Sequence, residues 1–221
     1  MRGRFITFEG GEGSGKSTQA TLLVRRLRAL ALTVVLTREP GGSTGAEVIR
    51  YILLSGAAKP LGAEIETVLF AAARDDHVRT TILPALERGK WVICDRFIDS
   101  TRVYQGALGN VDPRIIRSLE RVTIVDAMPD LTFILDVPAE VGLERAAKRR
   151  GDARADRFEQ EALAFHHRLR DAYRDVAARE PKRCVLIDAQ RPQSAVADEI
   201  WSVVSERLDP ATAPLALEDA R

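Results

Sequence analysis

Short apolar runs alternate along this chain with longer stretches in which apolar residues recur at helical spacing. The short runs predict β-strands, because about four to eight apolar residues between turn-forming residues suit a strand that is buried on both faces. The predicted strands are Arg4–Glu9, Thr33–Thr37, Trp91–Cys94, Leu131–Leu135 and Arg183–Ile187. The predicted helices are Lys16–Leu30, Ala46–Leu54, Ile65–Glu87, Pro113–Asp126, Ala139–Lys148, Phe158–Ala178 and Ser194–Leu208.

This order of strands and helices is typical of the α/β class, and we expect a parallel sheet of these five strands with helices on both faces. A chain of 221 residues fits one domain, which we assign to residues 1–209. Residues 210–221 are rich in Ala and Pro without a period, and we expect a flexible tail. Residues 148–158 are dense in arginine and poor in apolar side chains, which predicts a loop or a mobile lid.

The charge balance argues against two classes of binding protein. The 33 basic and 32 acidic residues give a formal net charge of +1, whereas proteins that bind nucleic acids or anionic membranes are usually lopsided in charge. No stretch approaches the roughly 20 apolar residues that span a bilayer. The N-terminus also lacks the pattern of a signal peptide. We therefore expect a cytoplasmic protein with no nucleic-acid and no membrane partner.

The cysteines and histidines predict no metal site. Cys94 and Cys184 are the only cysteines, and each lies in an apolar run, which favours buried thiols in a reducing compartment. The three histidines, His77, His166 and His167, show no metal-ligand spacing with the cysteines, and we expect them to be solvated residues on helices.

A complete phosphate-binding motif follows the first predicted strand. Residues 10–17 match G-x-x-x-x-G-K-[ST] and open a predicted helix, which is the context that the motif requires. Its glycines let backbone N–H groups converge on phosphate oxygens, and the helix N-terminus adds a positive dipole end. We expect Lys16 to reach the β- and γ-phosphates of a nucleoside triphosphate and Ser17 to help hold Mg²⁺. The expected ATP-binding residues here are Gly10, Gly11, Glu12, Gly13, Ser14, Gly15, Lys16, Ser17 and Thr18.

Other features narrow the class of reaction. The chain has no Asn/Thr-Lys-x-Asp element, which a GTPase would need to read guanine. A short chain with an arginine-rich segment after the phosphate-binding loop suggests phosphoryl transfer to a small acceptor, because such a lid can exclude water from the site.

Five segments together resemble the motifs of bacterial thymidylate kinases in order and spacing. They are Phe8–Thr18, Thr37–Gly42, Phe70–Arg74, Asp95–Phe97 and Ser100–Gly106. Asp156–Glu159 resembles the end of the family's lid, and the resemblance covers residues 4–205. It implies the P-loop NTPase fold, direct transfer of the ATP γ-phosphoryl group to dTMP with Mg²⁺ as a step in dTTP synthesis, and a homodimer. Small-molecule nucleotides are then the partners.

The resemblance also implies an acceptor site. Phe70 and Arg74 project from one helix face, where Phe70 would stack on thymine and Arg74 would bond its O4 carbonyl. Arginine has only donors, so it suits that carbonyl and disfavours the amino group of cytosine. Glu12 would approach the 3′-hydroxyl, and Tyr104 would exclude a 2′-hydroxyl. The implied dTMP-binding residues are Glu12, Glu39, Pro40, Arg50, Phe70, Arg74, Arg96, Ser100, Thr101, Tyr104 and Gln105.

The same resemblance implies the catalytic groups. Asp95 and Arg96 follow a predicted strand, where ligand-binding residues of parallel sheets gather, and would lie at Mg²⁺ and at the acceptor phosphate. Glycine at position 13 and the lid arginines match the branch of the family that supplies arginine from its lid. The lid is longer than usual, which leaves open which arginine acts. The implied catalytic residues are Lys16, Asp95, Arg96, Arg149, Arg150 and Arg154, with Ser17 and Asp95 at the metal and Arg145 stacked on adenine.

Other interpretations stay open at this point. The acceptor could be dUMP or another small phosphate, or the chain could be a nucleotide-binding regulator that does not transfer phosphate. Phe70 and Arg74 could be a core aromatic and a solvated charge, Ser100 could only cap a helix, and the lid arginines could be a solvated basic loop.

Overall fold

A computed structural model describes residues 2–124, 126–151 and 158–210. Within these residues, five strands form one parallel sheet in the order β2-β3-β1-β4-β5. The strands are β1 (Phe5–Glu9), β2 (Val34–Arg38), β3 (Trp91–Asp95), β4 (Leu131–Asp136) and β5 (Cys184–Asp188). Each strand lies within one residue of its predicted bounds, and the predicted fold class is confirmed.

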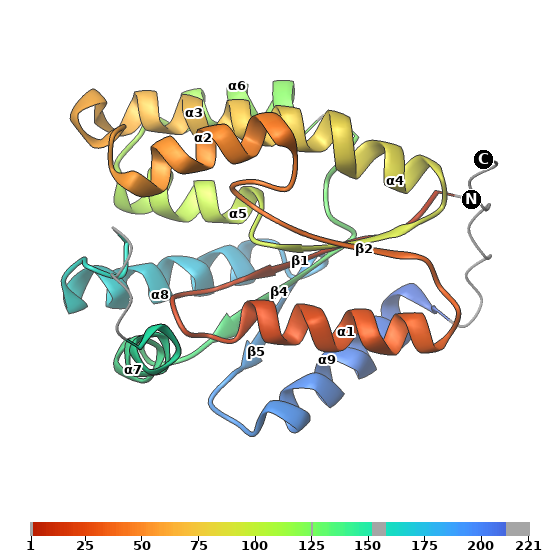
Figure 1. Cartoon of the computed structure of the whole chain (residues 1–221). Helices are drawn as coiled ribbons and strands as arrows, with labels where there is room; N and C mark the ends of the chain where they lie inside the picture. Colours follow the sequence, from red (N-terminus) through yellow and green to blue (C-terminus); the bar gives the residue numbers. More distant parts are fainter. Residues whose placement is uncertain (1, 125, 152–157, 211–221) are drawn as a thin grey trace.

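Helices cover both faces of the sheet (Figure 1). On one face, α1 (Lys16–Ala29) and α9 (Gln193–Leu208) pack on apolar side chains of the central strands, among them Ile6 and Phe8. On the other face lie α3 (Gly62–His77), the π-helical segment η2 (Val78–Ile82), α4 (Leu83–Glu87) and α8 (Leu163–Arg179). Successive strand residues point to opposite faces, so Glu9 shares the face of α8 rather than that of α1.

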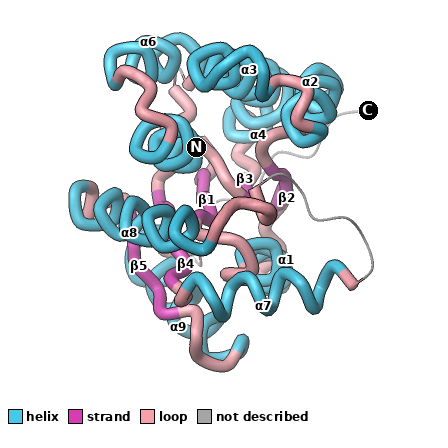
Figure 2. The backbone as a smooth tube through the Cα atoms, turned by 90° about the vertical axis from the view of Figure 1, so that its left-hand side faces the viewer, coloured by secondary structure: helices cyan, strands magenta, loops and turns pink. Residues whose placement is uncertain are grey.

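The remaining elements surround the carboxyl ends of the strands. Figure 2, turned by 90°, shows the strands between a layer with α2, α3 and α6 and a layer with α1 and α9. The remaining elements are α2 (Thr44–Ser55), the 3₁₀ turn η1 (Lys59–Leu61), α5 (Ile98–Thr101), the π-helical segment η3 (Arg102–Leu108), α6 (Pro113–Thr123) and α7 (Ala139–Arg150).

Two helical regions differ from the expected pattern. The long helix expected over Ile65–Glu87 contains the π-helical turn η2. Pro84 lies two residues beyond its end, and a proline inside a helix removes a hydrogen bond and crowds the carbonyl four residues earlier, which here lies in η2. The predicted helices do not include the helical run from Ile98 to Leu108, because its polar side chains point into the molecule and hide the apolar period.

The expectation that all three histidines are solvated is wrong for two of them. His77 is 0% exposed and His166 is 4% exposed, whereas the side chain of His167 is 47% exposed. His77 falls on the inward stripe of α3 and His166 on that of α8, so each is buried by its place on the helix. Cys94 and Cys184 are buried free thiols, as predicted.

Two predicted segments fall largely outside the described residues. Residues 152–157 of the predicted lid, with Arg154, and residues 211–221 of the predicted tail lie there. In the part of the chain that the structure describes, no helix combines the length and apolar character needed to cross a membrane.

Candidate active site

The phosphate-binding loop joins β1 to α1 and packs backbone to backbone against α7. Gly13 has a φ of +64°, and a Cβ there would lie 1.9 Å from the carbonyl oxygen of Gly142. A Cβ on Gly142 would in turn lie 2.4 Å from the carbonyl oxygen of Glu12. Both the left-handed conformation and this close approach require glycine at position 13, so an arginine side chain does not fit in this loop.

Lys16 is buried and folded back on the loop. Its Nζ donates to the carbonyl oxygens of Gly10, at 3.1 Å, and Gly11, at 2.7 Å. Burial, and then the positive charge of Arg96, lowers the pKa of Lys16 to about 8. The nearby carboxylates act in the opposite direction but are outweighed. The phosphates of a bound triphosphate would supply the anionic partner that favours the charged ammonium group.

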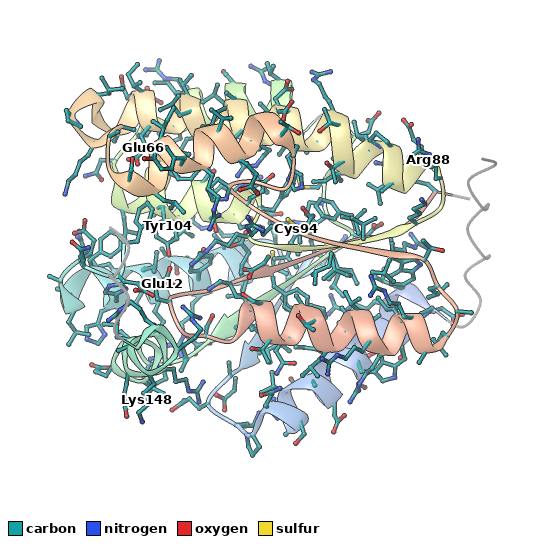
Figure 3. The ribbon with its side chains drawn as sticks, in the orientation of Figure 1. Glu12, Glu66, Arg88, Cys94, Tyr104 and Lys148 are labelled. Atoms are coloured by element: carbon teal, nitrogen blue, oxygen red, sulfur yellow. The ribbon has the colours of Figure 1, made fainter. Side chains whose placement is uncertain are left out.

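Glu12, Arg96 and Tyr104 form one cluster at this end of the sheet, where Glu12 and Tyr104 lie in Figure 3. The Arg96 Nη2 lies 2.5 Å from the Glu12 Oε1, which also accepts from the Tyr104 hydroxyl at 3.2 Å. The Arg96 guanidinium lies 5.3 Å from the centre of the Tyr104 ring. Burial opposes ionisation of Glu12, but the charges of Arg96 and Lys16 outweigh it and lower the pKa of Glu12 to about 2.

The backbone of Arg96 is held in an unusual conformation. Its φ is +69°, a left-handed region that costs a side-chain-bearing residue energy. The Arg96 N–H donates to the Phe8 carbonyl at 2.9 Å, and the next N–H, that of Phe97, donates to the Glu9 Oε1 at 2.7 Å. The end of β1 therefore fixes the turn from which the Arg96 guanidinium reaches the site.

Glu9 is a buried carboxyl group that sequence reasoning missed. Besides the Phe97 N–H, it accepts from the Ser100 N–H at 3.2 Å, the Ser100 hydroxyl at 2.7 Å and the Tyr173 hydroxyl at 3.0 Å. Burial, and then the charge of Asp99, raises the pKa of Glu9 to about 7. An acidic residue at the end of an otherwise apolar strand, next to a phosphate-binding loop, was the available signal. Ser100 lies inside α5 and does not cap it, so the capping interpretation is wrong.

Two oxygen ligands suited to Mg²⁺ meet beside the loop. The Ser17 hydroxyl donates to the Asp95 Oδ2, so the first turn of α1 and the end of β3 bring both oxygens together. Mg²⁺ prefers such hard oxygen ligands and usually takes the rest of its shell from phosphates and water. The described residues include no cluster of three or more His, Cys, Asp or Glu side chains that could hold a metal. The two oxygens therefore fit an ion that arrives with a nucleotide.

The expected base reader, Arg74, is only 3% exposed and is not a solvated charge. Its Nε lies 2.8 Å from the Glu39 Oε2, and its Nη2 donates to the Phe97 carbonyl at 3.2 Å. These contacts hold the guanidinium at the junction of α3, the end of β2 and the turn after β3.

One cavity of about 350 Å³ joins these groups. Every expected dTMP-binding residue lines it, as do Gly13, Gly15, Lys16, Ser17, Thr18, Asp95 and Arg149. Sequence reasoning missed the lining residues Arg38, Leu54, Phe97 and Phe158. Of these, Arg38 ends β2 and Phe97 follows β3, so the strand ends that predicted their neighbours could have indicated them as well.

The other expected residues lie around this cavity. Gly10 and Gly11 line a smaller hollow beneath the loop, and Ser14 is buried. Arg150 Nη1 lies 2.6 Å from the Glu159 Oε2. Arg145, on α7, donates to the carbonyl oxygens of Ala189, at 2.9 Å, and Gln190, at 3.4 Å.

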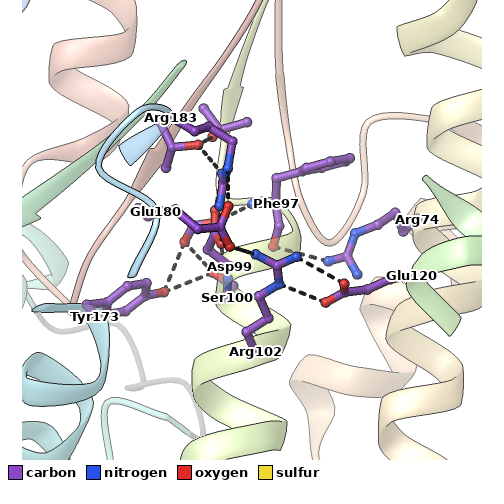
Figure 4. A network of polar contacts seen from close by, with 12 residues as sticks. Arg74, Phe97, Asp99, Ser100, Arg102, Glu120, Tyr173, Glu180 and Arg183 are labelled. Atoms are coloured by element: carbon purple, nitrogen blue, oxygen red, sulfur yellow. Dashed lines mark hydrogen bonds and ion pairs between the residues drawn. The ribbon is translucent and has the colours of Figure 1, made fainter. Parts of the chain in front are cut away.

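A buried network anchors the wall of the cavity that α5 and η3 form (Figure 4). Asp99, 0% exposed, accepts from Arg183 at 2.7 and 2.8 Å and from Arg102 at 3.2 Å. Arg102 also donates to Glu120 of α6 and to Glu180 beyond the end of α8. The helical run that carries Thr101, Tyr104 and Gln105 is thus tied to β5, α6 and α8.

A model of one protein family, described as thymidylate kinase, matches residues 8–200 of this chain. The chain belongs to the thymidylate kinase family. The thymidylate kinase of Nitrobacter winogradskyi is 64% identical over 207 residues, which cover 94% of this chain and 90% of that protein. The thymidylate kinase of a Bradyrhizobium strain is 61% identical over 212 residues, 96% of this chain and 94% of that protein.

A solved structure agrees with this membership. The crystal structure of thymidylate kinase from Ehrlichia chaffeensis superposes with a TM-score of 0.73 at 37% identity, covering 93% of this chain and 99% of that one. The expected P-loop NTPase fold and the expected class of enzyme, a kinase of the thymidylate kinase family that acts on dTMP, are confirmed. The roles of individual residues stay predictions.

Proposed function

We propose that this chain transfers the γ-phosphoryl group of ATP directly to the phosphate of dTMP, giving dTDP and ADP on the route to dTTP. The observation that carries this proposal is the single cavity in which the phosphate-binding loop faces all the expected dTMP-binding residues. The acceptor phosphate is already a nucleophilic oxyanion, so no covalent intermediate on the protein is needed. Catalysis then consists of positioning the two substrates and neutralising charge.

Arg96 and Arg50 would bind the acceptor phosphate. Arg96 now pairs with Glu12, and Arg50 donates to the Pro40 carbonyl at 2.5 Å, so both guanidinium groups already point along the cavity wall. A guanidinium can hold two phosphate oxygens at once, which fixes the nucleophile for in-line attack. Release of Glu12 from Arg96 would free its carboxylate to accept a hydrogen bond from the 3′-hydroxyl.

The thymine would lie between Phe70 and the groups of α5 and η3. Phe70 offers a ring face for stacking, and Arg74 offers donors to the O4 carbonyl. Thr101 and Gln105 line the same cavity, and the Tyr104 ring would fill the space of a 2′-hydroxyl. The pocket therefore supports a deoxynucleotide with a carbonyl at position 4.

The triphosphate would bind along the loop, with Lys16 released from its two carbonyl contacts to the β- and γ-phosphates. Ser17 and Asp95 would hold Mg²⁺, which neutralises charge on the phosphates when it is bound. Arg149 lines the cavity and Arg150, the next residue, pairs with Glu159, so both are candidates to stabilise the transferred group, with Arg154 outside the described residues. Arg145 would stack on adenine next to the carbonyls of Ala189 and Gln190.

We also propose that the enzyme works as a homodimer. Apolar side chains on the outer faces of α2 and α3, which lie side by side in Figure 1, are exposed: Val48 by 62%, Tyr51 by 78%, Ile65 by 48% and Val68 by 44%. Exposed apolar side chains on two neighbouring helices favour a self-complementary interface between two copies. A cytoplasmic location is supported by the two free buried thiols, which suit a reducing compartment.

The test is ADP release from ATP and Mg²⁺ in a coupled assay, with dTMP, dUMP, dCMP, dGMP, dAMP and ribo-TMP in separate reactions. A strong preference for dTMP, with ribo-TMP poor, supports the base and sugar assignments together. Preference for another acceptor would keep the kinase chemistry and overturn the pocket. ATP binding without acceptor-dependent turnover would indicate a regulator and overturn the proposal.

A further inference from the structure

A chain of hydrogen bonds runs behind the base pocket from Thr37 through His77 and Glu39 to Arg74. The Thr37 Oγ1 lies 2.7 Å from the His77 Nε2, and the His77 Nδ1 lies 3.0 Å from the Glu39 Oε1. The other oxygen of Glu39 pairs with the Arg74 Nε at 2.8 Å. His77 is 0% exposed, Arg74 3% and Glu39 6%, so these three members are buried, whereas Thr37 is half-buried.

The partners fix the roles of both ring nitrogens. A carboxylate that pairs with arginine can only accept, so the His77 Nδ1 must carry the proton that faces Glu39. In the neutral ring the Nε2 is then an acceptor, and the Thr37 hydroxyl donates to it. The hydrogen bonds therefore form one ordered series from the Thr37 hydroxyl to the Arg74 guanidinium.

The backbone at Gly42 leaves space for the hydrogen bond between Thr37 and His77. Gly42 has a φ of +86°, and a Cβ there would lie 2.4 Å from both the His77 Nε2 and the Thr37 Oγ1. The Gly42 carbonyl is held in turn by the Thr81 hydroxyl at 3.0 Å. Glycine at position 42 thus closes the loop directly over the contact between Thr37 and His77.

His77 does not line the cavity, whereas Glu39 and Arg74 do. Within the described residues, the Nη1 group of Arg74 has no hydrogen-bond partner, while its Nε and Nη2 are held by Glu39 and Phe97. The direction of that remaining donor group therefore depends on how Glu39 is held, and His77 holds the second Glu39 oxygen.

We infer that His77 is a positioning residue for base recognition: through Glu39 it fixes the guanidinium of Arg74, and so the specificity for a base with a carbonyl at position 4. This inference rests on the proposed function, because Arg74 must read the base for its direction to matter. His77 contacts no substrate in this arrangement. Its effect must therefore appear in the use of dTMP and in the choice between bases, and not in the use of ATP.

Two substitutions of His77 test the contributions of its two ring nitrogens separately. In His77→Asn the amide nitrogen takes the place of Nδ1, which keeps the donor to Glu39 and loses the link to Thr37. In His77→Gln the amide group reaches the place of Nε2, which keeps the link to Thr37 and loses the donor to Glu39. Both variants lose the imidazole ring, so a role in packing alone would affect them alike. His167→Gln, on the exposed face of α8, is the control for histidine replacement.

The measurements are KM for dTMP and for ATP, the ratio of kcat/KM for dTMP over dCMP, and dTMP binding by calorimetry without ATP. We expect His77→Gln to raise the KM and the Kd for dTMP roughly tenfold or more and to lower the dTMP preference similarly, since the lost bond goes to a charged group. His77→Asn should change these values far less, and the KM for ATP should stay constant in both. Equal losses in both variants, or parallel rises in the KM for dTMP and for ATP, would overturn the inference.

A second pair of variants covers the case in which neither histidine variant folds. Thr37→Ser keeps the hydroxyl group that orients the ring, and Thr37→Val removes it at similar size. Thr37→Val should raise the KM for dTMP and lower the base preference by the same small factor as His77→Asn, roughly threefold for one neutral hydrogen bond, while Thr37→Ser does neither; an unchanged Thr37→Val would overturn the inference. Wild-type turnover of dTMP is measured first, because its absence would refute the proposed function itself.

Discussion

The Glu12 carboxylate and the Arg96 guanidinium pair across the mouth of the phosphate site, with 2.5 Å between Oε1 and Nη2. Glu12 belongs to the phosphate-binding loop and Arg96 to the turn after β3, so the pair joins the two sides on which ATP and dTMP are expected. An incoming phosphate must displace this carboxylate from Arg96. If Arg96 binds phosphate as proposed, the pair sets the strength of phosphate binding before any chemistry occurs.

Glu12→Gln should strengthen the binding of inorganic phosphate. The substitution keeps the shape of the side chain and removes the negative charge that competes with phosphate for Arg96 and Lys16. We expect a roughly tenfold lower Kd for phosphate, measured by calorimetry at constant salt. Inorganic phosphate is the suitable probe because it has no sugar that Glu12 could contact. An unchanged or higher Kd would show that Glu12 does not compete for this site.

Arg74→Ala should impair the use of dTMP much more than the use of ATP. It removes the expected donors to O4 and leaves Glu39 buried without its cation, which costs about 3–5 kcal/mol of stability. We expect the KM for dTMP to rise roughly tenfold or more, with the KM for ATP little changed. The double variant Arg74→Met, Glu39→Gln should regain stability in urea unfolding without regaining dTMP use. An equal rise in the KM for dTMP and for ATP would mean that Arg74 does not contact the base.

Glu9 should make the enzyme less stable as the pH rises. Its folded pKa of about 7 lies above the ordinary value of 4.5, so the folded state binds a proton that the unfolded chain has lost. The stabilisation is complete below pH 4.5 and is lost as the pH rises through about 7. Between about pH 5 and about pH 8 this loss should be on the order of 2 kcal/mol.

Glu9→Gln should flatten that pH dependence without disrupting the fold. The Gln oxygen can accept from the two backbone N–H groups of Phe97 and Ser100, and its amide can donate to the hydroxyls of Ser100 and Tyr173. The free energy of unfolding, from urea melts at both pH values, gives the slope of wild type and variant. The same slope in both proteins would assign the pH dependence to another group.

Gly13→Ala should lower the free energy of unfolding by more than the strain of a left-handed alanine alone would. The new Cβ would overlap the carbonyl oxygen of Gly142, which lies 1.9 Å from its position. Gly56→Ala is the matched control, because Gly56, at the end of α2, is left-handed with φ +81° and ψ +3° but has open space around its Cβ. We expect Gly56→Ala to cost about 1 kcal/mol and Gly13→Ala clearly more, with weaker ATP binding, in urea unfolding and calorimetry. Equal costs would mean that α7 moves aside.

The strands and the motif residues at their ends could be predicted because their signals are local. Apolar runs gave the bounds of all five strands to within one residue, and the ends of parallel strands indicated Glu39, Asp95 and Arg96. Glu9 also ends a strand, but its partners and those of His77 could not be found in this way. The polarity of each is compensated by residues 38 to 164 positions away in sequence, such as Thr37, Phe97 and Tyr173. Only the folded chain brings these partners together.

The bidentate pair between Asp99 and Arg183 couples the wall of the acceptor pocket to the edge strand of the sheet. Arg102 extends this coupling to α6 and to the end of α8, so α5 cannot leave its place while these groups stay paired. Local opening of α5 would expose a buried carboxylate without its cation. The backbone amides of α5 should therefore exchange with deuterium only when β5 also opens, at a rate set by unfolding of the sheet.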